Sequence, residues 1–188
     1  QDSYVYEYLP NKNYGSETVL YVQAGESDAM RTYVKFDISQ IPTNAIITNA
    51  ILKLFLTYSS SSSVHIVNRV TGSWDESSIT WNNQPSITNI HETTSLIEIP
   101  ISEYKSYNVT LMTQDALGLE TISYRIIDSE ENSISRCQRF SSRHTGHPPK
   151  LYVEYSYEGA EYIFYGPFNE ETGLKDGNIT ITVYPAYG

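Results

Sequence analysis

The stretch Ala50-Ile51-Leu52-Lys53-Leu54-Phe55-Leu56 alternates strictly, with Ala and Leu at its even positions and Ile, Lys and Phe at its odd positions. Successive side chains of a β-strand point to opposite faces of the sheet, so the alanine and the leucines share one face. The stretch therefore predicts a strand with an aliphatic face turned to a core and a mixed face turned the other way.

Short runs of similar character recur at residues 31–39, 64–67, 97–101, 122–126 and 151–155. Each run is bounded by turn residues, a pattern typical of a β-sandwich or barrel. One short helix is expected at 111–117, where Gly118 is placed to end it. The predicted core consists of Phe36, Leu52, Leu54, Trp81, Ile126, Leu151 and Val153.

Length and charge exclude several classes of protein. The chain has 188 residues, enough for one domain with an appendage, and its 12 Lys and Arg against 22 Asp and Glu give a net charge of −10. Neither nucleic acid nor an anionic membrane surface suits such a chain, and no apolar run is long enough for membrane insertion. Because the sequence starts at Gln1, we expect an extracellular or cell-surface protein from which a signal peptide has been removed. Cys137 is the single cysteine, which excludes an internal disulfide, and we expect it to be buried.

No pattern for catalysis or for a cofactor is found. The sequence has no G-x-S-x-G, no HExxH and no Cys/His signature, so we predict that the protein is not an enzyme. His144 and His147 are expected in a solvated loop. Calcium is the one metal left open, through the hard oxygen ligands of Asp2, Asp37 and Asp128.

The most specific motif is Trp74-Asp75-Glu76 leading to Ile79-Thr80-Trp81-Asn82-Asn83-Gln84-Pro85. Together with Arg31–Asp37, Phe140–Arg143 and Pro149–Leu151, it resembles the DNRLRE-type domain, which is also known from disaggregatase-related repeats and from a carbohydrate-binding module family. The resemblance covers about residues 1–157. Within it, the fold-motif residues are Trp74, Glu76, Trp81, Asn82 and Pro85.

The resemblance implies a jelly-roll β-sandwich on secreted or surface proteins of bacteria and archaea. Some members bind polysaccharide, including acidic polymers such as alginate. The usual Asp before Val-Thr in the family is Asn108 here. The two tryptophans are expected to be structural, with their indole N–H groups bonded to backbone; the alternative is that they stack on sugar rings.

Two sites match the N-glycosylation pattern, Asn108-Val109-Thr110 and Asn178-Ile179-Thr180. The alternative at both positions is an ordinary asparagine of a strand.

Residues 158–188 form a C-terminal extension of different composition. It holds the aromatic residues Tyr162, Phe164 and Tyr165, and it ends in a predicted strand, 178–184. The apolar face of this strand carries Ile179, Ile181 and Val183, and Tyr184 closes it. Such a strand has three destinations: a hairpin with residues 161–165, the edge of its own sandwich, or the sheet of a neighbouring subunit.

The third destination underlies our first hypothesis. It makes the protein an extracellular filament or pilus-like subunit whose partners are copies of itself, with the aromatic residues of the extension as a second contact. The alternative is a non-catalytic carbohydrate-binding module or adhesin. For that case the net charge of −10 favours neutral polysaccharides over anionic ones.

Overall fold

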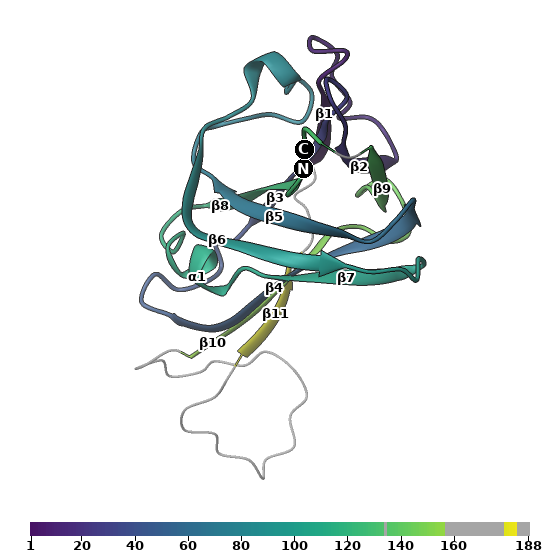
Figure 1. Cartoon of the computed structure of the whole chain (residues 1–188). Helices are drawn as coiled ribbons and strands as arrows, with labels where there is room; N and C mark the ends of the chain where they lie inside the picture. The colour runs from purple at the N-terminus through teal and green to yellow at the C-terminus, as the bar shows by residue number, and fades with distance from the viewer. Residues whose placement is uncertain (134, 157–178, 184–188) are drawn as a thin grey trace.

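The computed structural model describes residues 1–133, 135–156 and 179–183, the last of these as backbone only. Its strands form one antiparallel sheet of 11 strands that curls over on itself (Figure 1). This confirms the predicted all-β fold of jelly-roll type. Short alternating runs with polar turns between them favour this architecture because each strand has one face to bury.

The strands are β1 Asp2–Tyr6, β2 Val19–Ala24, β3 Met30–Asp37, β4 Ile46–Ser59, β5 Ser63–Val70, β6 Ile87–Ile97, β7 Glu103–Asn108, β8 Thr121–Asp128, β9 Arg136–Ser141, β10 Lys150–Ser156 and β11 Ile179–Val183. A 3-10 helix, η1, covers Trp81–Asn83, and the α-helix α1 covers Thr110–Gln114. The helix is shorter than predicted, and Gly118 adopts a φ of +90° in the turn that follows it. Within the described residues, no helix has the length and apolar character needed to cross a membrane.

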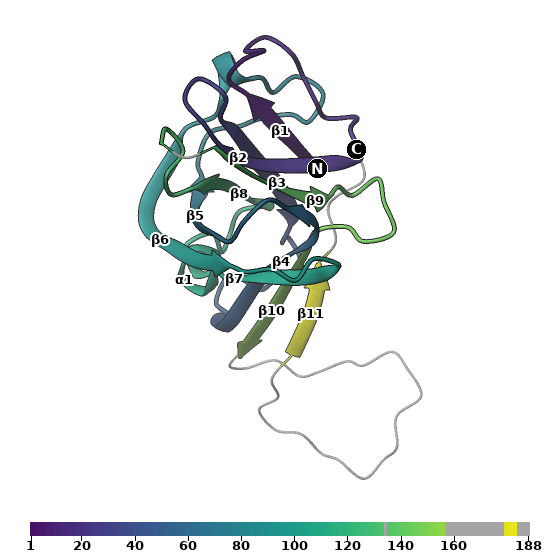
Figure 2. The ribbon, with the colours of Figure 1, turned by 45° about the vertical axis from the view of Figure 1, so that its right-hand side comes forward.

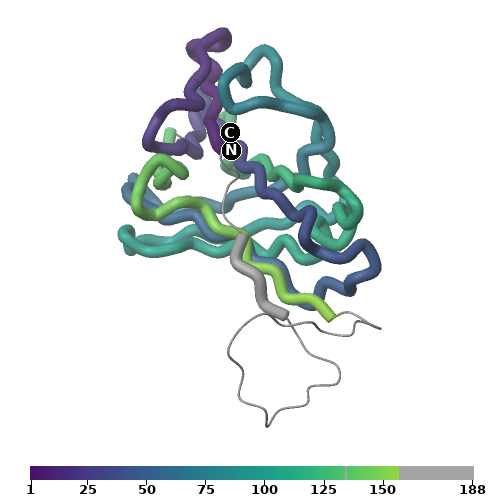
Figure 3. The backbone as a smooth tube through the Cα atoms, turned by 180° about the vertical axis from the view of Figure 1, so that it is seen from behind, coloured from purple at the N-terminus to yellow at the C-terminus, as the bar shows by residue number. Residues whose placement is uncertain are grey.

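The curled sheet has two layers (Figure 2). One contains β1, β3, β8, β5 and β6, and the other contains β7, β4, β10 and β11, while β9 and β2 join β4 to β3. The main core lies between the layers, and six of the seven predicted core residues belong to it: Phe36, Leu52, Leu54, Ile126, Leu151 and Val153. Seen from behind, β10 runs beside β4 (Figure 3), which places Leu151 opposite Leu52.

Trp81, the seventh predicted core residue, is only partly buried, so that prediction is wrong. A second, smaller core covers the outer face of β1 and β3, built from Val5, Tyr33, Val70, Trp74 and Ile79. Trp81 packs at its margin. The Arg31 guanidinium lies over its ring at 4.3 Å, because η1 runs along the surface of the domain.

Cys137 is half-buried, not buried as predicted. It belongs to β9, where its neighbour Gln138 turns inward and is 1% exposed. Alternation along the strand therefore places Cys137 on the outer face.

The C-terminal strand β11 pairs with β10 of the same chain, with Val183 opposite Leu151 and Ile179 opposite Tyr155. This is the second of the three destinations, and it leaves the predicted strand exchange between subunits without support. β10 pairs with β4 along one edge, so its other edge is available to β11. Pairing within one chain also avoids the entropic cost of bringing two molecules together. The predicted assembly aromatics Tyr162, Phe164 and Tyr165, and also Asn178 and Tyr184, lie outside the described residues.

Candidate functional site

A buried ionic cluster joins three segments that are far apart in the sequence. Arg143, after β9, donates from Nε to Oε1 of Glu76 at 2.8 Å and from Nη2 to Oε2 at 2.6 Å. Its backbone N–H donates to Oδ2 of Asp2 at 2.7 Å, and the Asp2 N–H donates to Glu76 at 2.8 Å. We call Asp2, Glu76 and Arg143 the anchor cluster.

The two carboxyl groups of the anchor cluster differ in acidity. Burial raises the pKa of Asp2 to about 6, although hydrogen bonds from the Arg143 N–H and the Ser142 hydroxyl oppose the shift. Burial also acts to raise the pKa of Glu76, but the bonds from the Arg143 side chain and the Asp2 N–H outweigh it, so the pKa lies below its usual value. Glu76 is therefore the ionised partner that holds the guanidinium.

The loop at Gly15 fits tightly against the same cluster. A Cβ at Gly15 would lie 2.0 Å from the carbonyl oxygen of Glu76, so only glycine fits there. Asn13 Nδ2 donates to the carbonyl oxygens of Glu76 and Ile79, each at 2.8 Å. These contacts hold the segment around Glu76 on the domain.

The structure does not bring the three calcium candidates together. Asp37 accepts hydrogen bonds from Ser39, and Asp128 forms an ion pair with Arg136. Near Asp2, one ligand atom each from Asp2, Glu76 and His144 lie within 4.8 Å of one another. However, the Arg143 guanidinium already pairs with Glu76, and the Arg143 N–H donates to Asp2.

Trp74 and Lys35 hold the chain just before Glu76. Trp74 is 9% exposed and meets the Tyr33 ring edge-on at a centroid distance of 5.8 Å. Lys35 donates to the Trp74 carbonyl oxygen, and its Nζ lies 4.6 Å from the centre of the indole. Trp74 thus packs into the smaller core, but its buried Nε1 has no hydrogen-bond partner in the described part of the chain, contrary to prediction.

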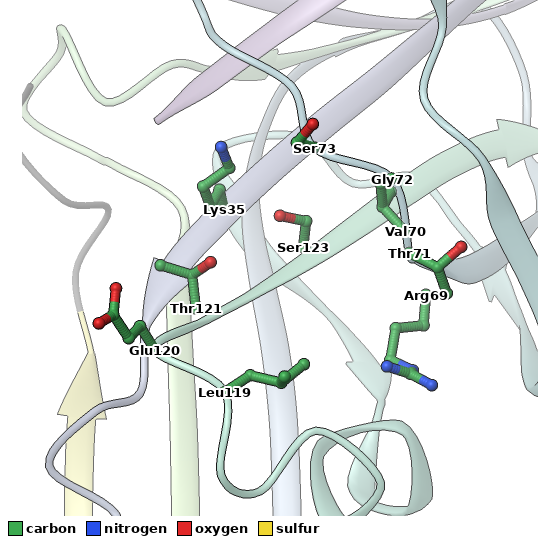
Figure 4. A pocket seen from close by; sticks show the side chains of 10 residues that line it. All are labelled: Lys35, Arg69, Val70, Thr71, Gly72, Ser73, Leu119, Glu120, Thr121 and Ser123. Atoms are coloured by element: carbon green, nitrogen blue, oxygen red, sulfur yellow. The ribbon is translucent and has the colours of Figure 1, made fainter.

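Beside this segment the surface is hollowed, with a cavity volume of about 420 Å³ (Figure 4). We call this feature the hollow. Strands β3 and β8, the end of β5 and the segment 71–73 surround it, and Lys35 and Arg69 lie on opposite sides. Its lining residues are Lys35, Arg69, Val70, Thr71, Gly72, Ser73, Leu119, Glu120, Thr121 and Ser123.

The lining of the hollow combines polar and apolar groups and offers varied hydrogen bonds. Thr71, Ser73, Thr121 and Ser123 contribute hydroxyl groups, which both donate and accept. Lys35, Arg69 and Glu120 add two cationic groups and one carboxylate to the lining, and Arg69 Nε is buried without a hydrogen-bond partner among the described residues. Burial lowers the pKa of Lys35, against the attraction of Asp75 and Glu76.

None of the fold-motif residues is among the described residues that line the hollow. Glu76 and Trp74 fix the segment that forms one wall, and Thr71 and Gly72 donate to the Ser86 carbonyl oxygen. Asn82 donates from Nδ2 to Asn11 at 2.8 Å, and Pro85 lies within 3.3 Å of where a Cβ on Gly72 would stand.

The predicted histidine loop makes two separate contacts. His144 Nε2 lies 3.2 Å from the Gly15 carbonyl oxygen, and the His147 ring stacks on Phe55. Both residues are exposed, as predicted. The lining residues Arg69, Glu120 and Thr121 were missed by the sequence reasoning, because no motif surrounds them.

Asn108 ends β7 and is exposed. Its Oδ1 accepts hydrogen bonds from the Thr110 N–H and hydroxyl, at 3.1 and 2.8 Å. Glycosylation at this position stays a prediction.

Comparison with known proteins gives one family. The model of carbohydrate-binding module family 96 matches residues 1–155, which supports the carbohydrate-binding part of the resemblance and does not confirm the DNRLRE-type name. A search of curated proteins finds no match to the chain. With most of its length matched, including the strands that form the core and the hollow, this chain belongs to carbohydrate-binding module family 96.

Proposed function

We propose that this domain binds a polysaccharide and that the hollow is a contact site for it. Membership of a carbohydrate-binding module family supports the ligand class. The observation that carries the choice of site is the lining of the hollow, which combines four hydroxyl side chains with Lys35, Arg69 and Glu120.

Sugars suit this lining because each ring carries several hydroxyl groups that donate and accept hydrogen bonds. Leu119, which is 52% exposed at the edge of the hollow, adds an apolar contact for the C–H face of a ring. Each direct hydrogen bond contributes about 0.5–1.5 kcal/mol net, so a few of them with one apolar contact give a modest affinity. Polymers with repeated binding units raise such an affinity by avidity.

We propose binding without cleavage. Most glycoside hydrolases use two carboxyl groups on either side of the bond, whereas Glu120 is the one acidic residue among the described residues that line the hollow. The prediction that the protein is not an enzyme fits its family of binding modules. An extracellular location stays part of the proposal.

The charge class of the sugar depends on two opposing effects. The net charge of −10 repels anionic polymers, but salt screens this repulsion beyond about 8 Å. The lining of the hollow itself contains two cationic side chains, Lys35 and Arg69, and one carboxylate, Glu120, which act on a bound sugar at short range. A preference for neutral glycans therefore stays a prediction.

Affinity gel electrophoresis tests the proposal, with a soluble neutral glucan in one gel and a polyuronate in another. Arg69→Gln removes a cation from the hollow, and Arg139→Gln on the exposed face of β9 is the matched control. We expect the Arg69 variant to lose retardation in at least one gel and the control to migrate like the wild-type protein. Equal retardation of both variants and the wild-type protein in every retarding gel would show that the hollow is not the site.

A further inference from the structure

The outer face of the second layer carries aromatic rings that the hollow does not use. Phe55 of β4 and Tyr104 of β7 stand opposite each other, with ring centres 5.2 Å apart. The His147 ring stacks on Phe55 at 4.0 Å. The Tyr104 hydroxyl donates to the Pro148 carbonyl oxygen at 3.2 Å, which ties the loop to the strand. The rings are thus held in a defined arrangement.

Two lysines complete this surface. Lys53 of β4 and Lys150 of β10 stand directly opposite each other. Lys53 Nζ lies 4.6 Å from the centre of the Tyr152 ring, and Lys150 Nζ lies 4.6 Å from that of Tyr104. Like charges directly opposite in a sheet are destabilising, and conflicts of this kind are expected where function requires them. We call Phe55, Tyr104, Tyr152, His147, Lys53 and Lys150 the ring face.

Polar groups of β7 adjoin the rings. Ser106 stands opposite Lys53, Asn108 stands opposite Ile51, and both are exposed. Phe55, Tyr104 and Tyr152 are partly exposed. The surface therefore offers aromatic faces for the C–H groups of sugar rings, and ammonium, hydroxyl and amide groups for their hydroxyls.

We propose that the ring face binds a polysaccharide chain, so that the domain has two separate binding surfaces and bridges two chains. The hollow lies on the outer side of β3 and β8, whereas the ring face lies on the outer side of β4, β7 and β10. Main-core residues such as Phe36 and Leu52 lie between them. The inference rests on the proposed function for its ligand class, but it does not depend on the hollow being a site.

To test this, the full chain is added in increasing concentration to a soluble polysaccharide that retards it in gels, and the turbidity of the mixture is measured. A bivalent protein gives a turbidity maximum, because at excess protein each molecule binds one polysaccharide chain only and the cross-links are lost. A monovalent protein forms no cross-links and gives no maximum. Tyr152→Ala and Lys53→Gln alter the ring face, and Arg69→Gln alters the hollow. Tyr58→Ala is the matched control, since Tyr58 is a 42% exposed tyrosine near the end of β4, where it pairs with β9 and lies beneath Arg139. Circular dichroism melts confirm that each variant is folded.

We expect Tyr152→Ala to weaken binding about five- to tenfold, as for the loss of one aromatic contact, and to abolish the turbidity maximum. Lys53→Gln, which keeps half of the aliphatic stem and removes the charge, also weakens binding. Tyr58→Ala changes neither the affinity nor the turbidity maximum. If Arg69→Gln loses binding and both ring-face variants bind like the wild-type protein, the ring face is not a binding surface, whereas the hollow is. The reverse result would support the ring face and reject the hollow. Wild-type turbidity without a maximum would reject bridging.

Discussion

Replacing Arg143 by Met tests whether the anchor cluster holds the wall of the hollow in place. The substitution keeps an unbranched apolar stem but removes the guanidinium that bonds both oxygens of Glu76. The two side chains are 15% and 11% exposed, so the pair is largely withdrawn from water. Removing one partner of a buried pair costs about 3–5 kcal/mol, and the partial exposure of this pair places the expected cost at the lower end, about 3 kcal/mol. For a domain of this size such a loss lowers Tm by about 6–12 °C.

The loss should depend on pH in a defined direction. In the absence of the guanidinium, the Glu76 and Asp2 carboxyl groups remain buried beside each other, with carboxylate oxygens within 4.8 Å of one another. Their pKa values in the folded variant then lie above those in the unfolded chain, so the folded state binds more protons. The free energy of unfolding of the variant therefore falls as the pH rises, and the cost of the substitution is greater at pH 7.5 than at pH 5.

Urea unfolding at both pH values measures these costs, with tryptophan fluorescence as the probe because Trp74 lies two residues from Glu76. Arg139→Met on an exposed face is the control. It loses the contacts of the guanidinium with Tyr21 and Tyr58, so the expected change is up to about 1 kcal/mol and the same at both pH values. A cost for Arg143→Met below about 1 kcal/mol at pH 7.5, or one that grows as the pH falls, would refute the role given to the pair.

Three further predictions follow from individual residues. Since the pKa of Asp2 is raised from 3.8 to about 6, its contribution to stability is fully present below pH 3.8 and is lost as the pH rises through 6; Asp2→Asn should remove this slope in thermal melts between pH 4 and pH 7. Gly15→Ala should destabilise the domain by about 1–3 kcal/mol in urea, because its Cβ would lie 2.0 Å from the Glu76 carbonyl oxygen, and an unchanged midpoint would contradict that close approach. Cys137→Ser should change stability by less than about 0.5 kcal/mol, whereas a loss above about 2 kcal/mol would mean that the thiol is a core group after all.

The strands and their inward faces could be predicted from the sequence because alternation is a local property. Leu52 and Leu54 lie two residues apart on one strand, and that spacing alone places them on one face. Trp81 shows the limit of this reasoning. It lies in a helix of three residues, which is too short for a hydrophobic period to indicate which side chains are buried.

The anchor cluster and the destination of the last strand were decided by the tertiary structure. Asp2 and Glu76 are separated by 74 positions, and only the closing of the curled sheet brings them into contact. β11 has the same alternating sequence whether it joins its own sheet or another, so its pattern predicts a strand but not its partner. The hollow and the ring face arise in the same way: side chains of Lys35 and Ser123, or of Phe55 and Tyr104, meet across strands whose pairing is a long-range property of the fold. Local chemistry determines which residues form strands, whereas the pairing of distant strands determines which surfaces they build.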